Sequence, residues 1–383
     1  MFKEVFVICI LLFSYVYAGW IPQYSGTTAN LNDVFFPTDT LTGYICGDSG
    51  IILKTTNSGY QWVRQTTPVT TKLNAIYFIG DTGWSVGESS TALWTTDGGT
   101  NWNGGSGPSW LTFYDIHFIN YNSGFVIGDS GIIYKTTDGG RTWFLILTPT
   151  NSALRSMFFI NNSLGWVVGD NKICIKTIDG GSIWESITLP IPSNSILRGV
   201  YFIDSLTGYV IGEFGRILKT IDGGLNWEVS NLLYNFYGID FEDSNTGYIC
   251  GAEGIIFKIP AGQYTFVNPL INLYSINFPV PRVGWTVGSN GSIYKTSDGG
   301  AMIGEINKKE SHSIFITPNP FTDYLTVKIP TQTKTSLKIY DKAGNLVAEE
   351  RITNGLFRLN SRTLSKGVYF IIMNGMITKV IKI

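Results

Sequence analysis

The 383-residue chain has little charge, few cysteines and almost no histidine. Only 14% of its residues are charged, and it has four cysteines and two histidines. His117 and His312 lie far apart and no CxxC pair is present, so the spacing that a zinc site requires is missing. After the first 18 residues, no apolar run approaches the ~20 residues that span a bilayer. We therefore predict neither a metal site nor a cofactor.

The scarce charges are unevenly distributed. Residues 19–303 contain 14 Lys and Arg against 21 Asp and Glu, whereas residues 304–383 contain 12 against 6. An acidic main body is poorly suited to contacting phosphate backbones, so we do not expect a nucleic-acid partner. We expect a monomer.

The N-terminus has the pattern of an export signal. Residues 1–18 begin with Lys3, continue through an apolar run and end in Ala18, which predicts a signal peptide cleaved before Gly19. Three cysteines then remain, Cys46, Cys174 and Cys250, at positions too separate in the repeats described below to form disulfides. We expect them to be buried as small apolar side chains.

A segment of 21 residues recurs through most of the chain. Its starts lie roughly 40 residues apart, the length of one four-stranded propeller blade, and short alternating β-branched runs precede and compose each copy. The seven copies are Thr42–Trp62, Thr82–Trp102, Ser123–Trp143, Leu164–Trp184, Thr207–Trp227, Thr246–Phe266 and Val283–Ile303. We predict an all-β chain whose residues 19–303 form a seven-bladed β-propeller, because single blades cannot bury both faces.

The seventh copy lacks the tryptophan that begins a fourth strand in most others and has Ile303 in its place. The sequence that follows the predicted signal peptide, Trp20–Tyr24, resembles that missing strand. We predict that it closes the last blade, so that the ring has no open edge.

Four of the seven repeats contain a turn of the form Thr-x-Asp-x-Gly-x-x-Trp, and the others keep parts of it. Its carboxylate can accept backbone N–H groups while the glycines supply positive φ, so we interpret these acids as structural. The acids are Asp97, Asp138, Asp179, Asp222 and Asp298, with Asn57 in the first repeat and no counterpart in the sixth. The motif resembles the Asp-box of bacterial neuraminidase repeats, which implies that the turns lie opposite the binding face. Residues 31–303 as a whole resemble photosystem II assembly-factor-like propellers, many of which are secreted.

The C-terminal region has a different pattern. Residues 304–314 form a polar, charged segment that we interpret as a linker, and residues 315–383 alternate apolar and polar positions as strands do. The marker residues are Pro318, Asn319, Pro320, Phe321, Gly367 and Tyr369. Together they resemble the type A sorting domain of the type IX (Por) secretion system. The resemblance implies a small Ig-like β-sandwich, recognition by that secretion machinery, and a secreted or cell-surface protein. The alternative is an ordinary immunoglobulin-like binding module.

A comparison of the repeats with one another suggests a binding position. The first residue of each innermost strand is always Leu or Phe, whereas the second is polar or aromatic and varies, as residues that determine specificity do. These second residues are Asn32, Asn74, Tyr114, Arg155, Arg198, Tyr237 and Tyr274. Trp110, in a loop on the same predicted face, joins them as a candidate. Such a rim suits a glycan, an anionic group or a peptide; the alternative is that these side chains only reach toward water.

Two functional classes remain open from the sequence. The first, which we favour, is a non-catalytic binding or scaffold module. The second is an Asp-box glycoside hydrolase. A sialidase needs an arginine triad, a Tyr–Glu nucleophile pair and an acid/base Asp, whereas a related glycosidase needs two carboxylates about 5–10 Å apart, and either usually has long loops on the binding face. The inner-strand acids Asp33 and Asp115 are two blades apart and the repeats have near-minimal loops. We therefore predict no catalytic residues.

Overall fold

A computed structural model describes residues 19–105, 110–300, 304–305, 315–317, 324–328, 335–342, 345–352, 356–360, 364–373 and 376–382. The chain divides into two compact units, one ending at Met302 and one beginning at Ile303. The predicted signal peptide, most of the predicted linker and the markers Pro318–Phe321 lie outside the described residues. Among those that are described, no helix is long and apolar enough to cross a membrane.

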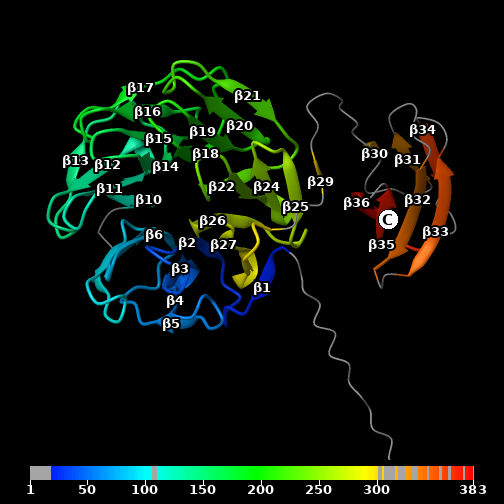
Figure 1. The fold of residues 1–383 in the computed structure, drawn as a ribbon, viewed down its shortest axis with the longest axis horizontal. Helices are drawn as coiled ribbons and strands as arrows, with labels where there is room; N and C mark the ends of the chain where they lie inside the picture. Colours follow the sequence, from blue (N-terminus) through cyan, green and yellow to red (C-terminus); the bar gives the residue numbers. More distant parts are fainter. Residues whose placement is uncertain are drawn as a thin grey trace, which may run out of the picture. The chain divides into compact units, whose positions relative to one another are not determined.

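The first unit is a ring of seven antiparallel sheets, which confirms the predicted propeller (Figure 1). Each sheet runs from an innermost strand at the ring centre to an outer strand. Blade 1 consists of β2 (Leu31–Phe35), β3 (Gly43–Gly47), β4 (Ile52–Thr55) and β5 (Val63–Gln65). Blade 2 consists of β6 (Leu73–Ile79), β7 (Thr82–Gly87), β8 (Ala92–Thr95) and β9 (Asn103–Gly105). Blade 3 consists of β10 (Phe113–Phe118), β11 (Gly124–Gly128), β12 (Ile133–Thr136) and β13 (Phe144–Ile146). Blade 4 consists of β14 (Leu154–Phe159), β15 (Gly165–Gly169), β16 (Cys174–Thr177) and β17 (Glu185–Ser186). Blade 5 consists of β18 (Leu197–Phe202), β19 (Gly208–Gly212), β20 (Arg216–Thr220) and β21 (Glu228–Asn231). Blade 6 consists of β22 (Phe236–Phe241), β23 (Gly247–Gly251), β24 (Ile255–Ile259) and β25 (Gln263–Phe266).

Blade 7 combines both ends of the propeller sequence. Its first three strands are β26 (Leu273–Val280), β27 (Val283–Gly288) and β28 (Ile293–Thr296). Its outer strand is β1 (Ile21–Gln23), in which Ile21 pairs with Lys295 and Gln23 with Ile293. The strand order is therefore β1-β28-β27-β26, and the outer strand of the last blade precedes the first blade in sequence.

Aromatic stacks hold neighbouring blades together. A phenylalanine lies five residues after the first residue of each innermost strand, and its ring packs on an aromatic residue of the preceding blade. The ring centroids of Phe118 and Trp84 are 3.6 Å apart, and those of Phe202 and Trp166 are 3.5 Å apart. The outer-strand tryptophan of the same blade meets that ring edge-on, as Trp143 does with Phe118 at 6.1 Å. Offset stacks and edge contacts of this kind each add roughly 1 kcal/mol beyond the apolar area that they bury.

The Asp-box turns join the third and fourth strands of their blades. They lie at the end of the blade opposite the loops that join the second and third strands, and hydrogen bonds hold them in shape. In blade 2, the Oδ1 of Asp97 accepts the Thr95 hydroxyl at 2.8 Å and the Asn101 N–H at 2.9 Å. These bonds lower the pKa of Asp97 to about 2. A lysine of the preceding blade donates to the turn, since Lys54 Nζ lies 2.7 Å from the Gly98 carbonyl. The acid thus shapes a turn and ties two blades together.

The cysteine prediction is confirmed. Cys46, Cys174 and Cys250 are buried and unpaired. Burial raises the pKa of the Cys174 and Cys250 thiols to about 12, so these groups stay protonated.

The second unit is a β-sandwich of two sheets with orders β30-β31-β34 and β33-β32-β35-β36. The strands are β30 (Phe315–Thr317), β31 (Tyr324–Lys328), β32 (Thr335–Asp341), β33 (Leu346–Ile352), β34 (Leu356–Asn360), β35 (Gly367–Met373) and β36 (Met376–Lys382); β29 (Gly304–Glu305) precedes them. Tyr369 is buried and its hydroxyl donates to the Ser365 carbonyl at 2.7 Å. This marker tyrosine therefore packs in the described core of the sandwich.

Candidate binding site

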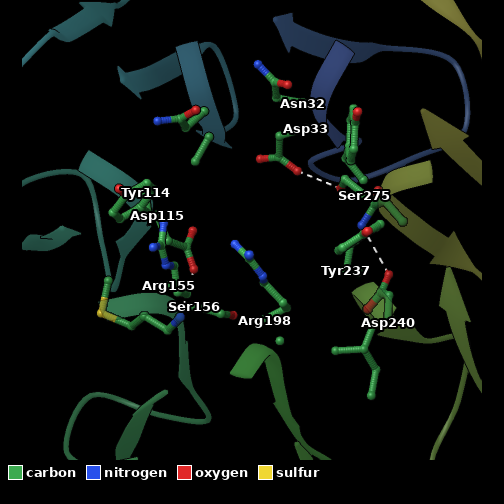
Figure 2. Close-up of a pocket in the computed structure, with 18 of the residues that line it drawn as sticks. Asn32, Asp33, Tyr114, Asp115, Arg155, Ser156, Arg198, Tyr237, Asp240 and Ser275 are labelled. Atoms are coloured by element: carbon green, nitrogen blue, oxygen red, sulfur yellow. Dashed lines mark hydrogen bonds between the residues drawn. The ribbon is translucent and has the colours of Figure 1, made fainter. Parts of the chain in front are cut away.

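A pocket of about 410 Å³ lies at the centre of the ring (Figure 2). Its wall consists of the second to fifth residues of all seven innermost strands. In each of these strands the pairing with the second strand shifts between the first and third residues, as between Leu31 and Asp33 or between Leu154 and Ser156. The second residue is therefore the extra residue of a β-bulge, which turns its side chain out of the regular alternation. The repeated bulge explains why this position can vary while the first remains Leu or Phe.

The structure brings seven of the eight candidate residues together. Asn32, Asn74, Tyr114, Arg155, Arg198, Tyr237 and Tyr274, here called the rim residues, all line the pocket. Trp110 does not line it and is 98% exposed in the loop before β10. Arg155 and Tyr114 lie on one side of the view in Figure 2 and Asn32 and Ser275 on the other. Trp110 is therefore separate from the pocket in this structure.

Acids in the loops between second and third strands anchor four of the seven rim residues, Asn32, Tyr114, Arg155 and Arg198. Asn32 Nδ2 donates to Asp48 at 3.1 Å, and Tyr114 Oη donates to Asp129 at 2.7 Å. These acids adopt the compact turn because the next residue takes a left-handed conformation, as Ser49 does at φ 59°. In blades 1 and 3 the Gly-Asp turn therefore orients the rim side chain of its own blade.

The two rim arginines form ion pairs of the same kind. Arg155 donates from Nε and Nη2 to the two oxygens of Asp170 at 3.0 and 2.7 Å, and Arg198 donates from Nε to Glu213 at 3.2 Å. The side chains of Arg155 and Arg198 remain 19% and 29% exposed. Each guanidinium is thus fixed in direction by an acid while part of it faces the solvent.

Aromatic rings extend this charged region. The Arg155 guanidinium lies 4.0 Å from the centroid of the Tyr114 ring, a cation–π distance. On blades 6 and 7, the rings of Tyr237 and Tyr274 lie 5.9 Å apart. The mouth therefore offers cationic donors, phenolic groups and flat apolar faces within one pocket.

Below the rim, three partly buried carboxylates connect the blades. Asp33 accepts the Ser275 hydroxyl of blade 7 at 2.7 Å and the Ile76 N–H of blade 2 at 2.9 Å. Asp115 accepts the Met157 N–H of blade 4 at 2.7 Å, and Asp240 accepts the Phe278 N–H of blade 7 at 2.6 Å. Each also accepts the N–H of the residue that follows it. These acids are acceptors for backbone donors that would otherwise be buried without partners.

Burial is the main influence on these three acids. It raises the pKa of Asp33 to about 6 and the pKa values of Asp115 and Asp240 to about 7, although the hydrogen bonds act in the opposite direction. A raised carboxyl pKa in a cavity is a feature of catalytic acids. Here both oxygens of Asp33 and of Asp115 already accept hydrogen bonds from their own and neighbouring strands. The contacts that these acids make between blades are a structural reason for their place in the pocket.

Aromatic side chains line the deeper part of the pocket. The ring of Tyr77 lies 4.8 Å from Phe35 and 5.0 Å from His117, and the rings of Phe158 and Tyr201 lie 4.5 Å apart. Burial lowers the pKa of His117 to about 4, so the imidazole is neutral at physiological pH. No group of three or more His, Cys, Asp or Glu side chains in the described residues is arranged to hold a metal ion.

Asp240 was not among the residues singled out from the sequence. It occupies the fifth position of β22, where five of the other innermost strands have an aromatic residue or histidine and β26 has Asn277. Alignment of the repeats at that position would have revealed it. The bulge, by contrast, has no signature in composition or alternation, because it depends on the register between two strands.

The fold and its central pocket define a seven-bladed Asp-box β-propeller with a polar, ion-paired rim, joined to a small β-sandwich. The family "Photosynthesis system II assembly factor YCF48" matches residues 14–104, 108–191 and 143–233, more than half of the chain. The protein belongs to this family. The family "Secretion system C-terminal sorting domain" matches residues 315–383, which confirms the sorting domain expected from the sequence.

Individual relatives are more distant. The photosystem II stability/assembly factor HCF136 of Oryza sativa subsp. japonica is 31% identical over 78 residues, which cover 19% of each chain. Among solved structures, YCF48 bound to D1 peptide shares 23% identity over 73% of this chain and 97% of that one, with a TM-score of 0.63. YCF48 from Cyanidioschyzon merolae (18% identity, TM-score 0.61) covers 73% of this chain and 99% of its own. These structural similarities establish the fold.

The sorting domain also indicates the destination of the protein. Domains of this family direct export through the outer membrane by the type IX machinery. The protein is therefore secreted or carried on the cell surface, as the sequence predicted.

Proposed function

We propose that the propeller is a non-catalytic binding module that works outside the cell. It captures a peptide segment of another protein at the rim of its central pocket. The observation that carries the proposal is the set of rim residues, which vary from blade to blade while a bulge redirects each of them and a loop acid fixes the direction of four. Side chains held in place before the ligand arrives lose little entropy on binding. The uniform propeller thus acts as a scaffold for a non-uniform rim.

The chemistry of the rim favours a peptide. Arg155 and Arg198 can donate to backbone carbonyls or carboxylates, and Tyr237 and Tyr274 offer flat surfaces for side chains. A pocket of about 410 Å³ accommodates a few residues and is too small for a folded domain. The relative described as YCF48 bound to D1 peptide provides a precedent in the same fold for a peptide ligand. A glycan is the other ligand class that such a rim could accept.

A non-catalytic role follows from the way in which the carboxylates are used. A glycosidase needs one acid to deliver a proton and a second to attack or to activate water. The oxygens of Asp33 and Asp115 accept hydrogen bonds from neighbouring strands, so proton transfer to a substrate would break contacts between blades. We therefore assign these acids to the scaffold.

The test is binding of the exported protein to a peptide array and to a glycan array, followed by affinity measurements on the best ligand. A double variant, Arg155→Gln with Arg198→Gln, should weaken binding at least about tenfold because two charged donors are lost. Arg64→Ala, on the exposed outer strand β5, is the control and should bind like the unsubstituted protein. Binding to glycans alone would contradict the peptide assignment, and turnover of a glycoside substrate that depends on Asp33 or Asp115 would contradict the non-catalytic one.

A further inference from the structure

The Asp-box turn of blade 7 is built from two distant parts of the chain. In blades 2 to 5, the turn carboxylate accepts the N–H of the residue immediately before the outer-strand tryptophan. Asp97 accepts from Asn101, and Asp138 accepts from Thr142 at 2.8 Å. In blade 7, Asp298 accepts the N–H of Gly19 at 3.2 Å, and Gly19 immediately precedes Trp20. Gly19 and Trp20 therefore complete a turn whose carboxylate, that of Asp298, lies 279 residues further along the chain.

Trp20 occupies the same place as the tryptophans of the continuous turns. Its ring meets Phe278 at 5.8 Å and 86°, as Trp62 meets Phe36 at 6.0 Å and 84° and Trp102 meets Phe78 at 5.9 Å and 89°. Trp20 is buried, with 8% of its surface exposed. The turn is thus a complete Asp-box that is split between the two ends of the propeller sequence.

The split gives this one turn a chemical property that the others lack. The predicted signal peptide ends at Ala18, so hydrolysis of the Ala18–Gly19 bond by water would leave a carboxylate on Ala18 and a free α-amine on Gly19. The donor to Asp298 then changes from a neutral amide to an ammonium group. Charge-assisted hydrogen bonds are roughly twice as strong as neutral ones.

We propose that the split Asp-box is a binding site for the α-ammonium group of Gly19, so that removal of the signal peptide strengthens the closure of the ring. Asp298 supplies the carboxylate, and β1 carries the amine into place by pairing with β28. The proposal is independent of the ligand-binding role, because the Asp-box turns lie at the ends of the strands away from the rim.

The other charged groups around this turn largely offset one another. Arg282 Nη2 donates to the Asp298 carbonyl at 3.4 Å, and its backbone N–H donates to Glu242 Oε2 at 2.6 Å. The Tyr248 hydroxyl donates to the Gly299 carbonyl at 2.9 Å, and Lys258 lies 5.4 Å from the Tyr248 ring centroid. Two carboxylates, Glu242 and Asp243, act on Tyr248 and offset the charges of Arg282 and Lys258. Asp298 is the acid whose side chain contacts Gly19.

The pH dependence has a definite sign. An α-amine ionises near pH 8 in an unfolded chain, and pairing with a carboxylate raises its pKa in the folded state. The added stability is therefore fully present below about pH 8 and is lost as the pH rises through the raised value. No other turn in the described propeller contains a chain-terminal amine as its donor.

The experiment compares two versions of the chain through Ile383, one beginning with a free Gly19 and one with a single serine added before it. Unfolding in urea is followed by tryptophan fluorescence, since all 11 tryptophans lie within residues 20–285 and none in the tail. At about pH 7 the free Gly19 form should unfold about fivefold more slowly, a size typical of a partly exposed ion pair. At about pH 10 the two rates should converge.

Two matched substitutions complete the test. Asp298→Asn should abolish the difference between the two N-termini, and the turn should still form because Asn57 fills the same role in blade 1, where its Oδ1 accepts the Gln61 N–H at 2.9 Å. Asp138→Asn makes the same change in a continuous turn and should leave the difference intact. Equal rates at pH 7, or a difference that persists in Asp298→Asn or at pH 10, would overturn the proposal. So would a mature protein whose intact mass, measured from its native host, shows a first residue other than Gly19.

Discussion

Mild acidification is expected to stabilise the propeller, because three partly buried carboxylates in the pocket prefer their neutral form in the folded state. Burial raises the pKa of Asp115 and of Asp240 from 3.8 to about 7, and that of Asp33 to about 6. Between these values and 3.8, the folded protein binds protons that the unfolded chain has released. Stability therefore falls as the pH rises through this window, and it increases as the pH is lowered.

The size of the effect follows from the same values. For a group with a pKa of about 7, lowering the pH from about 7.5 to about 5.5 adds about 2 kcal/mol to the free energy of unfolding. Asp33, with its lower pKa, adds about 1 kcal/mol. The three together give about 3–5 kcal/mol. His117 subtracts about 1 kcal/mol from this gain, because burial lowers its pKa from 6.5 to about 4 and only the unfolded chain takes up a proton there in this range. The Asp-box acids do not contribute here, because hydrogen bonds lower the pKa of Asp97 and Asp138 to about 2 and both stay ionised.

The assay is urea denaturation at a series of pH values with tryptophan fluorescence, which reports on the propeller alone. Asp115→Asn is the informative variant, because it cannot titrate and should reduce the pH dependence by about 2 kcal/mol over this range. Asp138→Asn, in an exposed turn, should leave the pH dependence unchanged. Loss of stability on acidification of the unsubstituted protein, or an unchanged pH dependence in Asp115→Asn, would refute the reasoning.

Three further predictions concern closure, turns and thiols. Trp20→Ala should destabilise the propeller by about 3–5 kcal/mol, because a buried aromatic ring is lost. Hydrogen exchange should then increase first in β28, whereas exchange that increases equally in all blades would contradict the role of Trp20 in ring closure. Lys176→Met should lower the free energy of unfolding by about 1 kcal/mol, since the Lys176 ammonium group donates to the Gly223 carbonyl of the next blade at 3.1 Å and lies 5.3 Å from the Trp166 ring centroid. An unchanged urea midpoint would argue against a stabilising contact between these two blades. Thiol titration of the folded chain from Gly19 should detect no reactive cysteine, and denaturant should expose three, whereas a rapid reaction in the native state would contradict the burial of Cys46, Cys174 and Cys250.

The repeat by itself determined the architecture. Gly-aromatic strands, Thr-x-Asp-x-Gly turns and the spacing of about 40 residues were sufficient to predict seven blades, because each blade satisfies its backbone hydrogen bonds locally and differs little from its neighbours. The tail motifs similarly identified a sorting domain. A comparison of the repeats also pointed to the seven rim residues, since a variable polar position within a uniform repeat is visible without coordinates.

Tertiary structure decided what those residues do. The bulge that directs the rim side chains is a matter of register, the ion pair of Arg155 with Asp170 joins residues 15 positions apart, and Trp110 proved to lie outside the pocket. The link from Asp33 to Ser275 joins residues 242 apart, and only closure of the ring brings them within hydrogen-bonding distance. Local patterns specify strands and turns, but contacts between the first and last blades exist only once the whole ring has formed.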